Sequence, residues 1–124
     1  MKNLLCDNVD EFENCISNAK AEAGEKPLIL MFTGAVVEST GRSWCPDCTN
    51  AHPIIQDALK DTDAVLVTLP VHREDFRNSD LMYRTNNLIS LKCVPTLMRW
   101  PNTTMRLDDS KSQKKEFIQT LLED

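Results

Sequence analysis

Two cysteines separated by two residues, Cys45 and Cys48, are the side chains of this sequence best suited to chemistry. They form the only C-x-x-C among the five cysteines of the chain. Two thiols at this spacing at the start of a helix can close a small disulfide ring, so the pair predicts thiol–disulfide exchange. Cys45 is expected to be the nucleophile, and Cys48, one helical turn further on, is expected to resolve the mixed disulfide.

The two residues between the cysteines influence this chemistry in different ways. Pro46 is favoured at the first helical position, which places Cys45 at or just before the helix start, beside unpaired backbone N–H groups. Those groups and the positive end of the helix dipole stabilise a thiolate, the attacking species in disulfide exchange. The carboxylate of Asp47 opposes that thiolate. We expect the helix terminus to prevail and to leave a milder thiolate than an uncharged C-x-x-C would have.

Half of a zinc site is the alternative interpretation of the C-x-x-C. Zinc takes four Cys or His ligands in its structural sites. The remaining candidates are Cys6, Cys15, His52, His72 and Cys93, and the sequence has no second C-x-x-C and no H-x-x-x-H. We therefore expect no metal and no bound cofactor, only a redox-active Cys45–Cys48 pair.

The segments on either side of the pair predict an α/β domain. Residues 27–33 and 64–69 are nearly continuous apolar runs, typical of strands that are buried on both faces. A helical pattern lies between them, from Cys45 to about Lys60. Strand, helix and strand then form a βαβ unit whose crossover helix begins at the cysteines.

The rest of the chain supplies further elements to one domain over residues 1–124. In chain order they are an edge strand at 4–6, a helix capped by Asp7 or Asn8 that ends at Gly24, a short helix from Asn78 or Ser79 through Asn86, strands over 94–100 and 104–107, and a helix over 111–122. The last helix has a core stripe of Phe117, Ile118, Leu121 and Leu122, against which Trp100 is expected to pack. The predicted order is (β)αβαβαββα.

Composition excludes several function classes. The formal net charge of −5 supplies no basic excess for a nucleic-acid or anionic-membrane partner. The longest apolar stretch, Leu28–Phe32, is far shorter than the ~20 residues that a membrane span needs. The N-terminus has only a three-residue apolar run, too short for a signal-peptide core. We expect a cytoplasmic protein, in which most thiols stay reduced.

Four segments together resemble a known family. They are Phe32-Thr33-Gly34, Gly41-Arg42-Ser43, Trp44-Cys45-Pro46-Asp47-Cys48 and Val94-Pro95-Thr96-Leu97. Over nearly the whole chain the sequence resembles the thioredoxin domain-containing protein 17 family, within the thioredoxin-fold superfamily. The resemblance implies a central mixed β-sheet flanked by helices on both faces.

The resemblance also assigns roles to individual residues. Trp44 would shield the disulfide and line the substrate groove, beside Pro46 and Asp47 within the motif. Pro95 would follow a cis peptide bond and face the thiols, and the backbone of Val94 would pair with the substrate. Thioredoxins carry a buried Asp at the position of Met31, so the proton acceptor for Cys48 stays open.

The implied activity is that of a protein-disulfide reductase that acts as a monomer. Its substrates would be small or exposed disulfides, such as cystine and cysteinylated thiols, with electrons from NADPH through thioredoxin reductase. A redox-regulated binding module with little turnover and a thiol peroxidase are the alternatives. For the missing proton acceptor, Asp47, Glu38 and water are the candidates.

Other residues allow two interpretations each. Cys93 lies two residues before Pro95 and is either a regulatory thiol or simply a small side chain. The loop over 35–43 either restricts access of substrates or is a plain connection. Cys6 and Cys15 are expected to be inert packing, and His52 is either a helix-surface residue or a titrating neighbour of the thiols.

Overall fold

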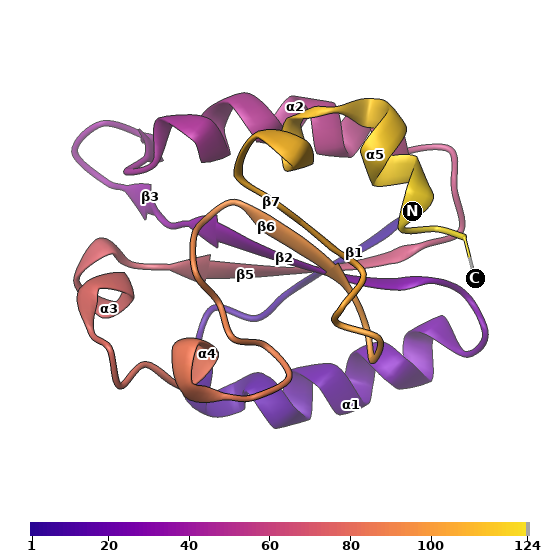
Figure 1. Cartoon of the computed structure of the whole chain (residues 1–124), viewed down its shortest axis with the longest axis horizontal. Helices are drawn as coiled ribbons and strands as arrows, with labels where there is room; N and C mark the ends of the chain where they lie inside the picture. Colours follow the sequence, from indigo (N-terminus) through magenta and orange to yellow (C-terminus); the bar gives the residue numbers. More distant parts are fainter. Residues whose placement is uncertain (124) are drawn as a thin grey trace.

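A computed structural model describes residues 1–123, apart from the side chain of Asp109. Its central sheet has five strands in the order β1-β5-β2-β6-β7 (Figure 1). The strands are β1 (Lys2–Leu5), β2 (Leu28–Gly34), β5 (Val65–Val71), β6 (Thr96–Arg99) and β7 (Arg106–Asp108). β2 and β1 each pair with β5 in parallel, whereas β6 is antiparallel to β2 and to β7. The predicted mixed sheet is confirmed.

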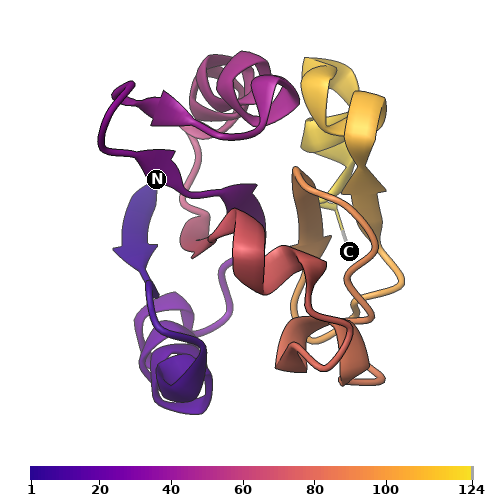
Figure 2. The same ribbon diagram turned by 90° about the vertical axis from the view of Figure 1, so that its left-hand side faces the viewer.

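Helices cover both faces of this sheet. They are α1 (Phe12–Ala23), α2 (Pro46–Leu59), α3 (Arg73–Arg77), α4 (Met82–Thr85) and α5 (Lys115–Thr120), with 3-10 turns η1 (Val9–Glu11) and η2 (Asp109–Gln113). Figures 1 and 2 show α2 and α5 on one face and α1 and α4 on the other. None of the helices in the described part of the chain combines the length and apolar character that a membrane crossing requires.

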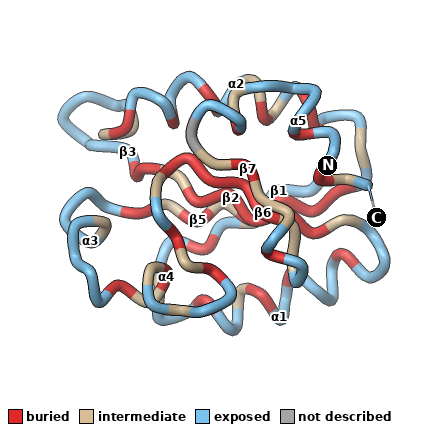
Figure 3. The backbone as a smooth tube through the Cα atoms, in the orientation of Figure 1, coloured by how far each residue is buried: buried red, intermediate tan, exposed pale blue. Residues whose placement is uncertain are grey.

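The alternation of side chains along β2 explains the two-layered core. Leu28, Leu30 and Phe32 join the cluster on the α1 side, while Ile29 and Met31 join the cluster on the α2 and α5 side. Successive side chains of a strand point to opposite faces, so a strand buried on both faces must be apolar throughout. Figure 3 shows this burial along the central strands.

Two features are inserted into the predicted order. The loop over 35–43 contains a small hairpin of β3 (Val36–Val37) and β4 (Arg42–Ser43). The predicted start of the helix at Asn78 or Ser79, which the sequence predicts to run through Asn86, is wrong, because α4 begins only at Met82. Asn78 instead ends the separate helix α3. The sequence pattern assigns no element to the polar segment after β5, and α3 occupies it.

The C-terminal helix differs from the prediction over 111–122. Lys114 is extended, with φ −119° and ψ 115°, and separates η2 from a short α5. The side of α5 that faces the sheet carries Ile118 and the following Leu121, which are buried, whereas Phe117 lies beside this stripe and is 39% exposed. The prediction of Phe117 as a core residue is wrong.

Trp100 packs on the other side of the sheet from the one predicted. Its ring lies 6.0 Å from that of Phe12 in an edge-on arrangement, within the cluster on the α1 side. Met98 shares that side, as strand alternation requires, whereas α5 packs on the face of Leu97. The predicted contact of Trp100 with the C-terminal helix is therefore wrong.

Candidate active site

The two cysteines lie at the start of α2, where the sequence placed them. Cys45 is the N-cap residue, with extended backbone (φ −106°, ψ 112°), and Pro46 occupies the first turn. The backbone N–H of Cys48 donates to Sγ of Cys45 over 3.3 Å. The sulfur thus takes the place of a capping oxygen, and one of the unpaired N–H groups of the helix start points at it.

The Cys45 thiol also contacts the loop before β6. It donates to the carbonyl oxygen of Val94 over 3.6 Å, and the Val94–Pro95 peptide bond is cis, as the family resemblance implied. Cys45 is 7% exposed and Pro95 is buried. The structure therefore brings together three of the expected site residues, Cys45, Val94 and Pro95, from segments 49 residues apart.

Cys48 lies deeper, against the end of β2. Its side chain is 3% exposed, and its Sγ accepts the backbone N–H of Gly34 over 3.2 Å. Burial raises the pKa of the Cys48 thiol to about 12, and the neighbouring Cys45 thiol contributes in the same direction. The N–H of Gly34 and the hydroxyl of Thr33 act the other way. At neutral pH Cys48 is a protonated thiol that needs a base in order to attack.

Gly34 and Ser43 hold the backbone of Cys45 in position. The Ser43 hydroxyl donates to the carbonyl of Gly34 over 2.8 Å and accepts the N–H of Cys45 over 3.1 Å. A Cβ on Gly34 would lie 2.6 Å from the Ser43 oxygen and 3.0 Å from the Cys45 Cβ. A glycine fits here because the side chains of Ser43 and Cys45 lie directly against its backbone.

Trp44 spans from the motif to the end of β5. Its indole N–H donates to the carbonyl of Val71 over 2.7 Å, and its ring lies 5.8 Å from that of Phe76 in α3. The Arg84 guanidinium stands over the other ring, 5.1 Å from the centroid of Phe76. Sequence reasoning did not single out Phe76, although a lone aromatic in the polar stretch after β5 was a usable signal.

The remaining candidates lie around this centre. Asp47 is exposed in the first turn of α2, and Glu38 is exposed in the β3–β4 turn. Cys93 is half-buried, with its sulfur 3.8 Å from the hydroxyl of Thr96. A regulatory role for Cys93 stays a prediction.

Cys6 and Cys15 lie outside the motif, on the α1 side of the sheet. Cys6 is buried in the core and Cys15 packs against the same cluster. Burial raises the pKa of the Cys6 thiol to about 12, with a smaller contribution from Cys15. Among the side chains that the structure describes, no group of three or more His, Cys, Asp or Glu could hold a metal ion.

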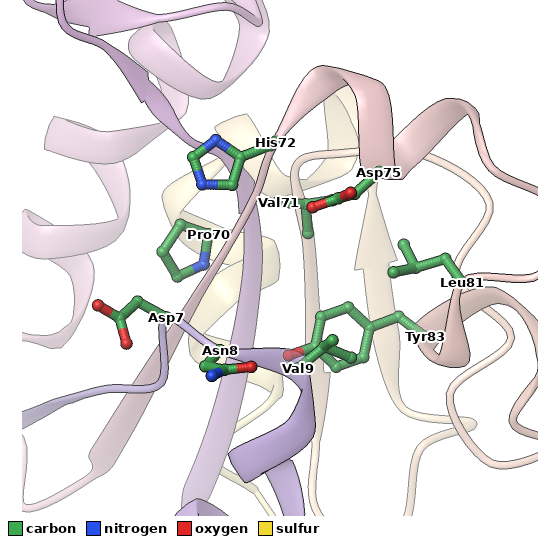
Figure 4. A pocket seen from close by; sticks show the side chains of 9 residues that line it. All are labelled: Asp7, Asn8, Val9, Pro70, Val71, His72, Asp75, Leu81 and Tyr83. Carbon is green, nitrogen blue, oxygen red and sulfur yellow. The ribbon is translucent and has the colours of Figure 1, made fainter.

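Two adjoining cavities open near this end of the sheet. The larger, about 620 Å³, lies behind Cys48 and reaches His52 of α2 and the β3–β4 hairpin. The smaller, about 330 Å³, is lined by Tyr83 and Leu81 on one side and by Asp7, Pro70 and His72 on the other (Figure 4). The last three residues line both cavities. Neither cysteine of the motif lines the smaller cavity.

This sheet, together with the Cys45–Cys48 pair at the start of α2, defines a thioredoxin-like protein. The fold is similar to that of thioredoxin O1 from Arabidopsis thaliana in its oxidised state, with a TM-score of 0.63 and 20% identity over 100% of both chains. Residues 6–124 match the thioredoxin domain described as thioredoxin domain-containing protein 17-like, and the chain belongs to this family.

Two curated relatives share much of the chain. The thioredoxin-like protein Clot of Arabidopsis thaliana is 27% identical over 122 residues, which cover 93% of this chain and 91% of the relative. Thioredoxin domain-containing protein 17 of Homo sapiens is 27% identical over 99 residues, which cover 77% of each.

Proposed function

We propose that this protein is a thiol–disulfide oxidoreductase that reduces disulfides with Cys45 as nucleophile and Cys48 as resolving thiol. The observation that carries the proposal is the Cys48 N–H directed at the Cys45 sulfur at the start of α2, beside the cis Val94–Pro95 bond. The start of a helix presents unpaired N–H groups and partial positive charge to a sulfur held there, and the thiolate is the attacking species in disulfide exchange. Membership of the family supports the same chemistry.

The reaction proceeds in two exchanges. The Cys45 thiolate attacks one sulfur of the substrate disulfide, forms a mixed disulfide and releases the first substrate thiolate. Cys48 then loses its proton and attacks Cys45, which releases the second substrate thiol and forms the Cys45–Cys48 disulfide. The substrate gains two electrons and the cysteine pair loses two. NADPH, through thioredoxin reductase, would return them.

Small or exposed disulfides, such as cystine and cysteinylated protein thiols, are the proposed substrates. Cys45 is 7% exposed, and the β3–β4 hairpin and Trp44 stand beside the motif, so a bulky folded disulfide has restricted access. Loops on a rigid scaffold commonly set access in this way. We also propose a cytoplasmic setting, where reduced partners keep the pair cycling.

A binding module with little turnover is the second candidate. The hairpin carries two exposed apolar side chains beside the site, Val36 at 63% and Val37 at 37%. Exposed apolar groups next to a redox pair could dock a partner protein whose binding changes with oxidation. This candidate predicts binding that depends on the redox state, together with turnover too slow to measure.

The test is turnover of cystine and of insulin with NADPH and thioredoxin reductase. We expect rapid cystine reduction, slower insulin reduction, and loss of both in Cys45→Ser; Cys93→Ser is the matched control at a cysteine outside the motif. No turnover with either substrate would contradict the proposal and favour the binding module. Peroxide turnover that persists in Cys48→Ser would favour a thiol peroxidase instead.

A further inference from the structure

The resolving thiol faces a cavity that Cys45 does not line. The cavity of about 620 Å³ has apolar walls from Met31, Ala35 and Val36, and Cys48 lies at its inner end. Cys48 is 3% exposed, and burial raises the pKa of its thiol to about 12. Because the attacking species is the thiolate, the second exchange needs a group that takes this proton at neutral pH.

The two strands beneath the cavity, β2 and β5, offer no proton acceptor on this face. Met31, the β2 side chain on this face, is buried and cannot accept a proton. Thr68, its partner in β5, also lines the cavity and is a hydroxyl that does not titrate near neutral pH. Asp47 and Glu38, the two acids nearest in sequence to the motif, are not among the lining residues.

His52 is the base that the geometry provides. It lies four residues after Cys48 in α2, so the two side chains are neighbours on one helix face, and both line the cavity. Its ring is exposed to solvent, so a proton that reaches it can leave to bulk water. Imidazole is the side chain whose ordinary titration range includes neutral pH.

Three other charged or titratable groups face this cavity from the surrounding elements. They are Asp7 after β1, Arg42 of β4 and His72 after β5. His72 also lines the smaller cavity. Figure 4 shows its ring beside Pro70, across that cavity from Tyr83. His52 alone of these groups belongs to the helix that carries Cys48.

We propose that His52 accepts the Cys48 proton, through water in this cavity, during resolution of the mixed disulfide. The inference rests on the proposed function and deepens it. As the Cys48 proton moves to the imidazole, the Cys48 sulfur bonds to Cys45, and the bond between Cys45 and the substrate sulfur breaks. The electron pair of that bond leaves with the substrate thiolate, and the imidazolium returns its proton to that thiolate or to water.

The two exchanges can be followed separately with an aromatic disulfide that releases a coloured thiolate. After acid quenching, mass spectrometry of the peptides around Cys45 and Cys48 distinguishes the mixed disulfide from the internal disulfide. The first step reports attack by Cys45 and tests the proposed function. The second step reports resolution by Cys48 and tests the role of His52.

In the wild type we expect resolution to accelerate with pH and then to level off, because a general base acts only in its unprotonated form. His52→Gln should slow resolution roughly 100-fold near neutral pH, leave the attack step within about twofold, and lose this levelling-off, because a thiol that must ionise without a base reacts faster at each higher pH. His72→Gln, which replaces the only other histidine of the chain, should retain it. Added imidazole should partly restore resolution in His52→Ala, since the cavity is wide enough to admit it.

Wild-type resolution rates and pH dependence in His52→Gln would overturn the inference, as would transfer of the effect to His72→Gln. If added imidazole did not restore resolution in His52→Ala, the slower resolution would be due to lost packing, and this result would also contradict the inference. Absence of the attack step in the wild type would overturn the proposed function itself, and the inference with it.

Discussion

The backbone N–H of Cys48 points at the sulfur of Cys45 over 3.3 Å, so the residue that resolves the mixed disulfide also holds the attacking sulfur in place. This contact closes the first turn of α2 and couples the two cysteines before any disulfide forms. It also places the Cys45 sulfur at the positive end of α2, where charge on neighbouring residues has the greatest effect.

Removal of the negative charge at Asp47 should make Cys45 more reactive. The carboxylate is exposed in the first turn of α2 and opposes a thiolate at the helix start. Charges at a helix terminus are worth about 0.3–1 kcal/mol, so Asp47→Asn should raise the rate of Cys45 alkylation at neutral pH roughly two- to fivefold. The effect should fade at high salt, because the site is exposed.

Alkylation with iodoacetamide, followed by peptide mass analysis, measures this rate at each cysteine separately. Asp10→Asn, at an exposed acid outside α2, is the matched control and should leave Cys45 unchanged. An equal or slower rate in Asp47→Asn would show that the acid does not temper the thiolate.

An added methyl group at Gly34 should disturb the site more than the fold. A Cβ there would lie 2.6 Å from the Ser43 hydroxyl and 3.0 Å from Cys45, so the segment that carries the nucleophile must move. Overpacking of this kind costs about 1–3 kcal/mol, and Gly34→Ala should lower both the free energy of unfolding and the rate of disulfide exchange.

Gly24→Ala distinguishes the two effects. Gly24 has φ 58° at the end of α1, and a Cβ added there would meet open space, so its substitution strains the backbone far from the thiols. It should reduce stability by about 1 kcal/mol and leave the exchange rate unchanged. Similar exchange rates in both variants would contradict the close approach at Gly34.

Local signals made the motif predictable from sequence. Pro46 at the first helical position and the spacing of the cysteines determine the helix start, and the apolar runs determine β2 and β5. The N-cap position of Cys45 and the parallel pairing of β2 with β5 follow directly from such short-range patterns.

Features that depend on distant contacts were not accessible in this way. The side on which Trp100 packs depends on which face of the sheet each side chain of β6 takes, and the exposure of Phe117 depends on which side of α5 packs against the sheet. The break at Lys114 is likewise not indicated by any helix-breaking residue. The cavity that joins Cys48 to His52 exists because β1, β5 and the hairpin meet beside α2. Such a meeting is a property of the tertiary structure, and periodicity within one element cannot reveal it.

The indole hydrogen bond of Trp44 should contribute measurably to stability. Its N–H donates to the Val71 carbonyl over 2.7 Å and ties the motif to the end of β5. Trp44→Phe removes this bond and should cost about 0.5–1.5 kcal/mol beyond the loss of ring volume.

Trp100→Phe controls for ring volume in this comparison. The Trp100 indole nitrogen is buried and has no hydrogen-bond partner among the described residues. Urea unfolding of both variants should therefore show a larger loss for Trp44→Phe. An equal loss would mean that the Val71 contact adds nothing to stability.

Alkaline pH should destabilise the fold through its buried thiols. The pKa values of Cys6 and Cys48 are raised from an ordinary 9.0 to about 12, chiefly by burial. Between pH 9 and 12 the unfolded chain has lost these protons while the folded chain keeps them. The folded state binds more protons, so the free energy of unfolding falls as pH rises, by at most about 1.4 kcal/mol per pH unit for each thiol.

Cys6→Ala should remove one of these two contributions, and urea unfolding under reducing conditions at a series of pH values measures it. Its stability curve should run parallel to the wild type below pH 9 and fall less steeply above it. Ile16→Val, a trimmed neighbour in the same core cluster, should cost about 0.5–1.5 kcal/mol equally at every pH. If Cys6→Ala kept the full wild-type slope above pH 9, the buried Cys6 thiol would not be a source of the alkaline instability.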